Sequence, residues 1–227
     1  METVLPIVIP EQVSPPRGRK QAVTKSPSFL TTTFAGHTMF GGSSAELISN
    51  GIRSNRTCTI QISNHLSVPL TLPHFHCFDG GLYYPLPAVI QPGTREACVF
   101  SKNPSSPHGV IGVLTYQIGD SPRRVAVMFS VAYNQLQYRN HFGTAIVTGF
   151  DLENSALFTH SEDEEEDEVT LLFDRMYQDA DFYQRGGRAH SLANDGVPMW
   201  TTDGAYQIRG TMSDRGKAIV KLNISTA

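Results

Sequence analysis

Hydrophobic residues recur at every second position over much of the chain, and this spacing limits the fold more than any other feature of the sequence. In residues 57–62, TCTIQI, apolar side chains point one way and polar side chains the other, as in a half-buried strand. The same period is found at 125–131, within a strand candidate at 124–131, and at 218–224. Further strand candidates are residues 98–101, 110–117, 144–147 and 206–212.

Turn signals separate these runs. The chain has 19 glycines and 14 prolines, and motifs such as DGG at 79–81 and DRG at 214–216 are typical of tight turns between strands. Many short strands joined by such turns favour an all-β sandwich or barrel over a helical fold.

Two segments have helical character instead. Residues 43–51 begin with a serine that can cap a helix and end at a glycine, and they place Leu47, Ile48 and Ile52 on one side. Residues 168–182 carry apolar side chains at helical spacing. The sequence therefore predicts a mainly β fold: a compact β-sandwich flanked by one or two short α-helices.

Charge and proline content divide the chain unevenly. Residues 1–35 scatter five prolines among Ser, Thr, Lys and Arg, so we expect a flexible tail there and one domain over residues 36–227. The net charge is −3, but residues 162–168 are seven consecutive acids, and the rest of the chain carries −3 + 7 = +4. A mildly basic body without a broad basic stripe predicts no nucleic-acid partner.

No sequence motif points to catalysis, a metal or a cofactor. The nucleophile elbow, the phosphate-binding loop and the zinc-protease motif are all missing, so we expect a protein that is not an enzyme and has no cofactor. His74 and His76 face the same way if they lie on a strand, yet a third metal ligand is lacking, so no metal site is predicted. Cys58, Cys77 and Cys98 lack a C-x-x-C spacing; small buried thiols are favoured, and one disulfide pair with a leftover thiol stays open.

The N-terminus and the hydropathy pattern bear on where the protein acts. METVLPIVIPEQ has an acidic start, a short apolar run broken by proline and no cleavage pattern, which does not fit a signal peptide. Apolar runs in the chain are shorter than a membrane span. We therefore expect a soluble protein that reaches the outside by a route without a signal peptide, or by release from cells.

A group of aromatic residues is the best candidate for a binding site. They come from the segment after the 125–131 strand and from the predicted helix at 168–182. Tyrosine rings attract a quaternary ammonium group through cation–π interaction, and their hydroxyls can bond a phosphate. The alternative is that the same rings simply seal the helix against the sheet. The residues are Tyr133, Tyr138, Phe142, Tyr177, Phe182 and Tyr183.

Four stretches in a fixed order resemble one known family. They are HGVIGVLTY at 108–116, VAVMFSVAYNQLQYRNHF at 125–142, DRMYQDADFY at 174–183 and IRGTMSDRGKAIVKLNIS at 208–225. Together they are similar to the actinoporins, the pore-forming cytolysins of sea anemones with relatives in fish, molluscs and mosses. The likeness covers about 170 residues from Arg56, and the placing of the three cysteines is closer to the fish relatives.

The resemblance implies a β-sandwich flanked by two helices and a function at membranes. Actinoporins bind sphingomyelin through a phosphocholine pocket and exposed aromatic side chains, then self-associate into oligomers and insert an N-terminal amphipathic helix as a pore. It implies for this chain a cytolytic, haemolytic channel that recognises sphingomyelin or phosphatidylcholine headgroups at a target cell membrane. Carried over by position, the lipid-binding residues are Ile111, Ser130, Ala132, Tyr138, Tyr177 and Asp181, and the membrane-facing loop has Gln137, His141 and Phe142.

The chain departs from the family at several of these positions. Ser130 is expected to bond the phosphate and Tyr138 and Tyr177 to face the choline, but Ala132 replaces a proline. Gln137 and His141 stand where the anemone toxins have tryptophan; Asp181, or Tyr183 after a slip of the alignment, stands where they have a further pocket tyrosine. The predicted helix at 43–51 is also half the length that crosses a bilayer. The alternative function is therefore a non-lytic module on the same scaffold that binds a lipid, a glycan or a protein.

Overall fold

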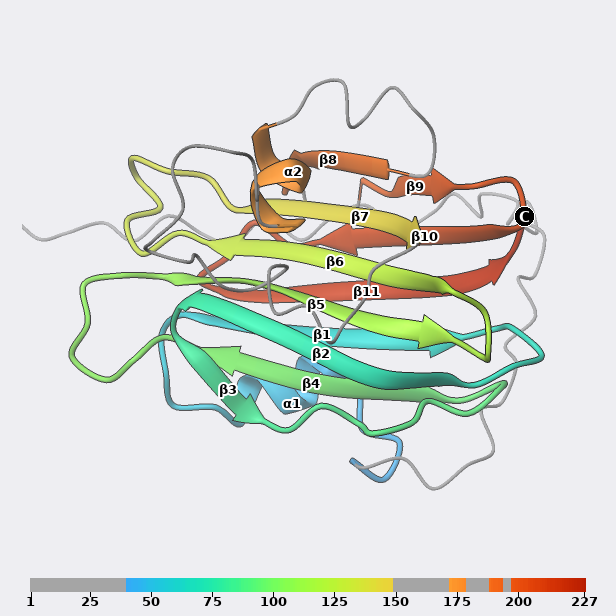
Figure 1. The fold of residues 1–227 in the computed structure, drawn as a ribbon. Coiled ribbons are helices and arrows are strands. Elements are labelled where there is room, and N and C mark those ends of the chain that lie inside the picture. The colour runs from blue at the N-terminus through green and yellow to red at the C-terminus, as the bar shows by residue number, and fades with distance from the viewer. Residues whose placement is uncertain (1–39, 149–171, 179–187, 194–196) are drawn as a thin grey trace, which may run out of the picture. The chain divides into compact units, whose positions relative to one another are not determined.

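The computed structural model describes residues 40–148, 172–178, 188–193 and 197–227. These residues form two β-sheets packed face to face, with two short helices on their outer surfaces (Figure 1). The predicted mainly β sandwich is thus confirmed. The predicted tail at 1–35, the acidic run at 162–168 and Asp181 lie outside the described residues.

Each sheet is built mainly of antiparallel neighbours. The first sheet has the order β3-β4-β1-β11-β10-β9 and the second has the order β2-β5-β6-β7-β8. One parallel pair, β1 with β11, joins the first strand of the domain to the last. The strands are β1 (Thr57–Asn64), β2 (Leu70–Asp79), β3 (Gly81–Tyr84), β4 (Arg95–Ser101), β5 (Val110–Ile118), β6 (Arg123–Val131), β7 (His141–Thr148), β8 (Arg188–Leu192), β9 (Met199–Thr202), β10 (Tyr206–Met212) and β11 (Lys217–Thr226).

The main core lies between the sheets and follows the alternation seen in the sequence. Ile60 of β1 and Val220 of β11 are register partners and are fully buried. Across the interface, the rings of Phe100 in β4 and Phe129 in β6 pack with centroids 4.7 Å apart. Burial of this apolar surface is the main driving force for folding.

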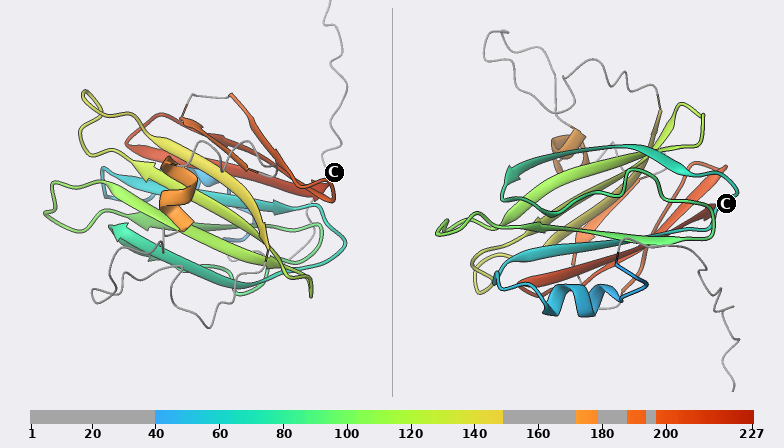
Figure 2. Two further views of the ribbon diagram at one scale, coloured as in Figure 1. Left: turned by 45° about the horizontal axis from the view of Figure 1, so that its top comes forward. Right: turned by 90° about the horizontal axis from the view of Figure 1, so that it is seen from below.

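Helix α1 (Ala45–Asn50) covers the outer face of the first sheet, as the right-hand view of Figure 2 shows. Ser44 caps it by accepting a hydrogen bond from Leu47 N, and Ile48 and Ile52 pack on β4. Because of this cover, the polar face of β1, including Thr57, is buried as well. The prediction that Leu47 shares the apolar side is wrong: it is 67% exposed, since neighbouring helix positions lie about 100° apart.

Helix α2 (Leu172–Gln178) covers the outer face of the second sheet over β6 and β7 (Figures 1 and 2). Leu172 and Met176 are buried against Met128 of β6 and Ala145 of β7. These two residues are one helical turn apart, so the helical spacing of the sequence is confirmed over the described part of the segment. None of the described helices is long and apolar enough to span a membrane.

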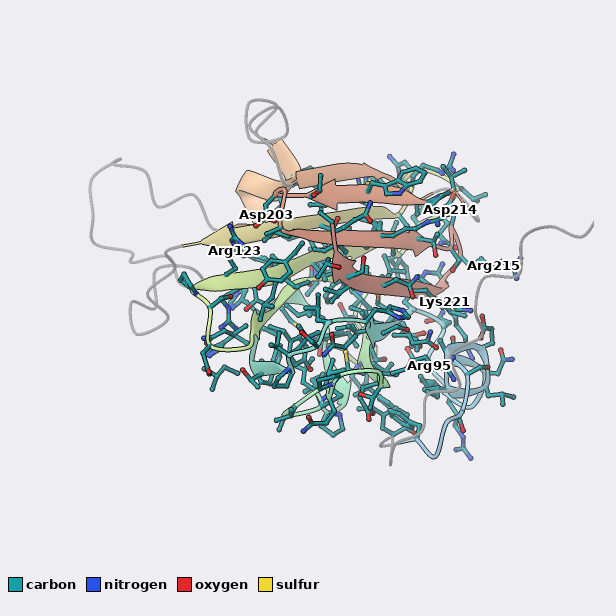
Figure 3. All side chains as sticks on the ribbon, turned by 90° about the vertical axis from the view of Figure 1, so that its right-hand side faces the viewer. Arg95, Arg123, Asp203, Asp214, Arg215 and Lys221 are labelled. Carbon is teal, nitrogen blue, oxygen red and sulfur yellow. The ribbon has the colours of Figure 1, made fainter. Side chains whose placement is uncertain are left out.

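Ion pairs connect the two sheets at both ends of the strands. At one end, Arg123 at the start of β6 pairs with Asp203 in the turn before β10, with Nε and Oδ2 3.0 Å apart. At the other, Arg139 pairs with Asp214 in the turn between β10 and β11. Figure 3 shows Arg123 and Asp203 on one side of the view and Asp214 with Arg215 on the other. The end that carries Arg139 and Asp214 is called the cavity end below.

The three cysteines are free thiols. Cys58 and Cys98 are buried in the main core, and Cys77 is half-buried. Burial raises the pKa of the Cys77 thiol to about 11, because the thiolate loses its hydration in apolar surroundings. The prediction of small buried thiols therefore holds for Cys58 and Cys98.

Candidate functional site

A cavity of about 330 Å³ opens at the cavity end, on the outer face of the second sheet. Its floor is one row of residues across four adjacent strands. Asp79 of β2 is the register partner of Ile111 in β5, Ile111 pairs with Ser130 in β6, and Ser130 pairs with His141 in β7. Paired residues on neighbouring strands point to the same face of a sheet, so the four side chains form a continuous floor.

A loop of residues 132–140 between β6 and β7 forms one side of the cavity. A turn shapes it: the backbone N–H of Tyr138 donates to the carbonyl oxygen of Asn134 at 2.9 Å. Tyr138 lines the cavity with its side chain 60% exposed, while Leu136 at the tip is fully exposed to solvent. The loop therefore offers one aromatic ring to the cavity and one aliphatic side chain to whatever lies in front of it.

Two buried or half-buried side chains hold this loop in place. The Asn140 side chain accepts from Ala132 N at 3.0 Å and donates to the carbonyl oxygen of Arg215 at 2.9 Å. The Arg56 guanidinium, before β1, donates to the carbonyl oxygens of Ala132 and Tyr133. Both ends of the loop are thus anchored to the first sheet, which fixes the shape of the cavity.

Helix α2 also contributes to the cavity wall. Its Tyr177 lines the cavity and lies against the His141 ring, with centroids 4.9 Å apart. Behind it, Phe173 stacks on Tyr177 at 5.8 Å and contacts Phe78 of β2 at 4.8 Å. This row of rings seals helix to sheet and also leaves Tyr177 partly exposed toward the cavity. The packing role considered for the tyrosines is therefore observed at Tyr177, which also lines the cavity.

Charged groups lie around the rim. His108 Nδ1 is 2.9 Å from Asp79 Oδ1, and Arg139 pairs with Asp214. Burial holds the pKa of His141 below its ordinary value of 6.5, because the imidazolium loses hydration between α2 and the sheet. At neutral pH the floor is therefore a hydroxyl, a neutral imidazole and a carboxylate beside two tyrosine rings.

Such a lining suits a small ligand that carries both a cation and hydrogen-bond acceptors. Tyrosine faces and the Asp79 carboxylate attract a cation, and the Ser130 hydroxyl can donate to an oxyanion. The volume falls in the ordinary range of ligand pockets, about 300–1,000 Å³. Within the described part of the chain, no group of three His, Cys, Asp or Glu side chains is placed to hold a metal ion.

The structure gathers most of the lipid-binding residues named from the sequence around this one cavity. Ile111 and Ser130 form the floor, Ala132 begins the loop, and Tyr138 and Tyr177 both line the cavity. Asp181 lies outside the described residues.

The three residues predicted to form a membrane-facing loop occupy three different kinds of position. Gln137 is exposed next to the tip, as expected. His141 is not in the loop: it begins β7 and lines the cavity. The placing of Phe142 is wrong, because it is 2% exposed and packs in the main core against Gly210. Since side chains alternate along a strand, His141 facing outward turns Phe142 inward.

Several residues at this site were not predicted from the sequence. Asp79, His108 and Arg139 line the cavity, and Leu136 occupies the tip of the loop. The sequence did hold a clue to Leu136, because it is the one aliphatic residue in the polar segment YNQLQYRN. Asp79 and His108 are 29 positions apart, and only the pairing of β2 with β5 brings them together.

Comparison with known proteins gives partial likenesses. No protein-family model matches the chain. Tereporin-Ca1 of Terebra anilis is 29% identical over 112 residues, which are 49% of this chain and 58% of that protein. Conoporin-Cn1 of Conus consors is 31% identical over 80 residues, 35% of this chain and 32% of that protein. The matches thus span from about a third to somewhat over half of the length of these relatives.

A solved structure shares the fold. The crystal structure of the lipid binding protein Nakanori superposes with a TM-score of 0.55 and covers 80% of this chain and 76% of its own. The sequences are 14% identical, so the likeness concerns the sandwich architecture.

Proposed function

We propose that this protein binds membranes by taking a phosphocholine headgroup, as in sphingomyelin or phosphatidylcholine, into the cavity. The observation that carries the proposal is the row Asp79–Ile111–Ser130–His141, with Tyr138 and Tyr177 lining the same cavity. Tyr138 and Tyr177 face the choline, where cation–π attraction contributes about 0.5–2 kcal/mol. Ser130 donates to the phosphate.

The same proposal places the tip of the loop in the membrane. Leu136 is fully exposed beside the cavity opening, so a headgroup held in the cavity brings it to the interfacial region of the bilayer. Burying one leucine side chain stabilises by about 1.5–3 kcal/mol. Leu136 thereby replaces part of the anchoring that Gln137 does not provide.

Pore formation is the further step of the proposal. The relatives Tereporin-Ca1 and Conoporin-Cn1 carry names ending in porin, and this supports self-association on the membrane followed by insertion of a segment before β1. The second candidate is a non-lytic binding module, favoured by the short α1 of six residues and its buried attachment to the first sheet. In either case the protein acts by binding and not as an enzyme.

Vesicle binding and dye leakage, with and without sphingomyelin, test these functions. We expect the wild type to sediment with choline-lipid vesicles and the double variant Tyr138→Ala, Tyr177→Ala to bind at least tenfold more weakly, because two cation–π contacts are lost. The control is Trp200→Ala, which removes an exposed ring on β9 away from the cavity. Unchanged affinity in the double variant contradicts the headgroup site. Binding without leakage rejects pore formation and retains the binding module.

A further inference from the structure

A second hollow lies at the cavity end, separate from the cavity. This groove has a volume of about 660 Å³ and is lined by residues from three places: 53–55 before β1, Gly81–Tyr83 of β3, and 101–104 at the end of β4. Gly81 and Ser101 are register partners, so these segments meet where β3 begins and β4 ends. None of the lipid-binding residues named from the sequence lines the groove.

The charges of the groove are all positive. Arg53 and Lys102 line it, and no carboxylate does so among the described residues. Lys102 Nζ donates to the carbonyl oxygens of Asn103 and Ser106, at 3.3 and 2.9 Å. Carbonyl oxygens are neutral, so they orient the ammonium group without cancelling its charge.

Arg56 adds a third cation beside the groove, and it too bonds only carbonyl oxygens, of Asn55, Ala132 and Tyr133. Two acidic residues at the cavity end, Asp79 and Asp214, do not line the groove. Asp79 pairs with His108 and Asp214 pairs with Arg139. The groove thus concentrates positive charge that no acidic partner neutralises within the described part of the chain.

Tyr133 connects the groove to the cavity. The Arg56 guanidinium lies 5.5 Å from the centre of its ring and Lys102 Nζ lies 5.7 Å from it, while Tyr133 itself lines the cavity. A ligand in the groove and a headgroup in the cavity would therefore sit on either side of this residue, on one end of the sandwich.

We propose that the groove binds a phosphate group in a mono- or diester, either on an anionic lipid or on a soluble phosphate ester. Arginine and lysine are the side chains best suited to phosphate, and the Asn55 and Asn103 amides, which also line the groove, are neutral donors. The lipid source rests on the proposed membrane function, because the groove then faces the same bilayer as the cavity. The phosphate site itself does not rest on it.

Vesicle sedimentation distinguishes the lipid source. We compare vesicles of phosphatidylcholine alone with vesicles that contain phosphatidic acid, using Arg53→Gln, Lys102→Gln and the double variant. A basic residue near anionic headgroups contributes about 1 kcal/mol, which is about fivefold in binding. We expect phosphatidic acid to strengthen wild-type binding, and the double variant to lose about 25-fold on anionic vesicles with no loss on phosphatidylcholine.

Titration with soluble glycerol phosphate, followed by amide chemical shifts, distinguishes the soluble source. Shifts near residues 53–55 and 101–104 that vanish in the double variant support a phosphate site open to soluble esters. The matched control is Arg95→Gln with Arg209→Gln, which removes the same charge from β4 and β10 outside the groove. If the Lys102 substitution unfolds the turn, Arg53→Gln alone, at an exposed side chain, still tests the site.

The outcomes separate this proposal from the headgroup proposal. If neither probe binds, or if both bind the double variant as tightly as the wild type, the groove is not a phosphate site. Phosphate binding that requires Arg53 and Lys102, together with unchanged phosphatidylcholine binding in Tyr138→Ala, would support the phosphate site in the groove and contradict the headgroup site in the cavity. If the tyrosine variants lose binding to phosphatidylcholine vesicles, while the groove variants bind phosphate and anionic vesicles as the control variant does, the headgroup site is supported and the phosphate site is contradicted.

Discussion

The Asn140 side-chain amide donates to the carbonyl oxygen of Arg215 at 2.9 Å, while its oxygen accepts from Ala132 N at 3.0 Å. One fully buried residue thus ties both strands around the loop to the turn between β10 and β11. A buried polar group with several partners is costly to remove, since each partner left unpaired loses a hydrogen bond.

Replacing Asn140 by alanine should therefore damage both stability and binding. We expect a loss of about 3 kcal/mol in the free energy of unfolding, measured by urea denaturation, together with weaker vesicle binding. Asn223→Ala is the control, because Asn223 is exposed on β11 and its side-chain oxygen lies 3.2 Å from the ring nitrogen of His65, which is exposed as well. This substitution should change stability by less than about 0.5 kcal/mol. Equal stability of the two variants would show that the Asn140 network is not a structural anchor.

At Gly109, on the rim of the cavity, the backbone lies very close to the backbone of Val131. A Cβ atom added there would lie 2.0 Å from the carbonyl oxygen of Val131, so the ends of β5 and β6 would have to move apart. We expect Gly109→Ala to destabilise the protein by about 2 kcal/mol or more, measured as a lowered melting temperature and urea midpoint.

Gly81→Ala is the matched control for that substitution. Nothing lies within 4 Å of a Cβ atom at Gly81, and its φ is not in the left-handed region. We expect no loss of stability, because the alanine fits and reduces the freedom of the unfolded chain. If Gly109→Ala is equally harmless, the strands at the cavity rim are less closely packed than the structure indicates.

Much of the fold followed from the sequence, because strands with one buried face repeat every two residues. β6 and β11 were placed within about one residue of their observed starts, and β10 was placed at its observed bounds. β2 was missed, since Pro73 interrupts it and Leu72 has a φ of 47° in a register shift between Thr71 and His74. β2 also lies at the edge of its sheet, so most of its side chains are only half-buried and the alternation of apolar and polar residues along it is weak.

The site was predictable only in part, because some of its residues are brought together by the register of strands that are distant in the sequence. Ser130 and Tyr138 lie within one continuous motif, so a family resemblance could place them. The Asp79–His108 pair depends on the register of β2 against β5, which a single sequence does not specify. Phe142 was misplaced because its exposure depends on where β7 begins, and a strand that starts at His141 turns Phe142 into the core.

The position of Leu136 makes it a test of membrane anchoring that is independent of the fold. Its side chain is fully exposed at the tip of the loop, so Leu136→Ala should leave the melting temperature unchanged. If the tip enters the bilayer, the substitution should weaken vesicle binding about tenfold, since a leucine buries more apolar surface than an alanine. Leu47→Ala, at an exposed leucine on α1, should leave binding unchanged. Equal binding by both variants would mean that the tip stays in water.

Acidification should destabilise the protein through three partly buried imidazoles. Burial lowers the pKa of His141 below 6.5, and it also lowers the pKa of His74 and His76. The unfolded chain therefore takes up protons first as the pH falls, so stability is complete above about pH 6.5 and declines as the pH drops below that value through the folded-state pKa values. Urea denaturation between pH 7.5 and pH 5 measures this decline.

His141→Asn isolates the contribution of the cavity. The variant should lose less stability than the wild type over the same pH range, and part of the decline should persist because His74 and His76 remain. Vesicle binding should respond as well, since an imidazolium beside Tyr177 repels the choline cation that the two tyrosines attract. We therefore expect wild-type binding to phosphatidylcholine vesicles to weaken at pH 5, and the His141→Asn variant to bind almost equally at both pH values. A wild type that binds equally well at pH 5 and pH 7.5 would place the choline away from His141.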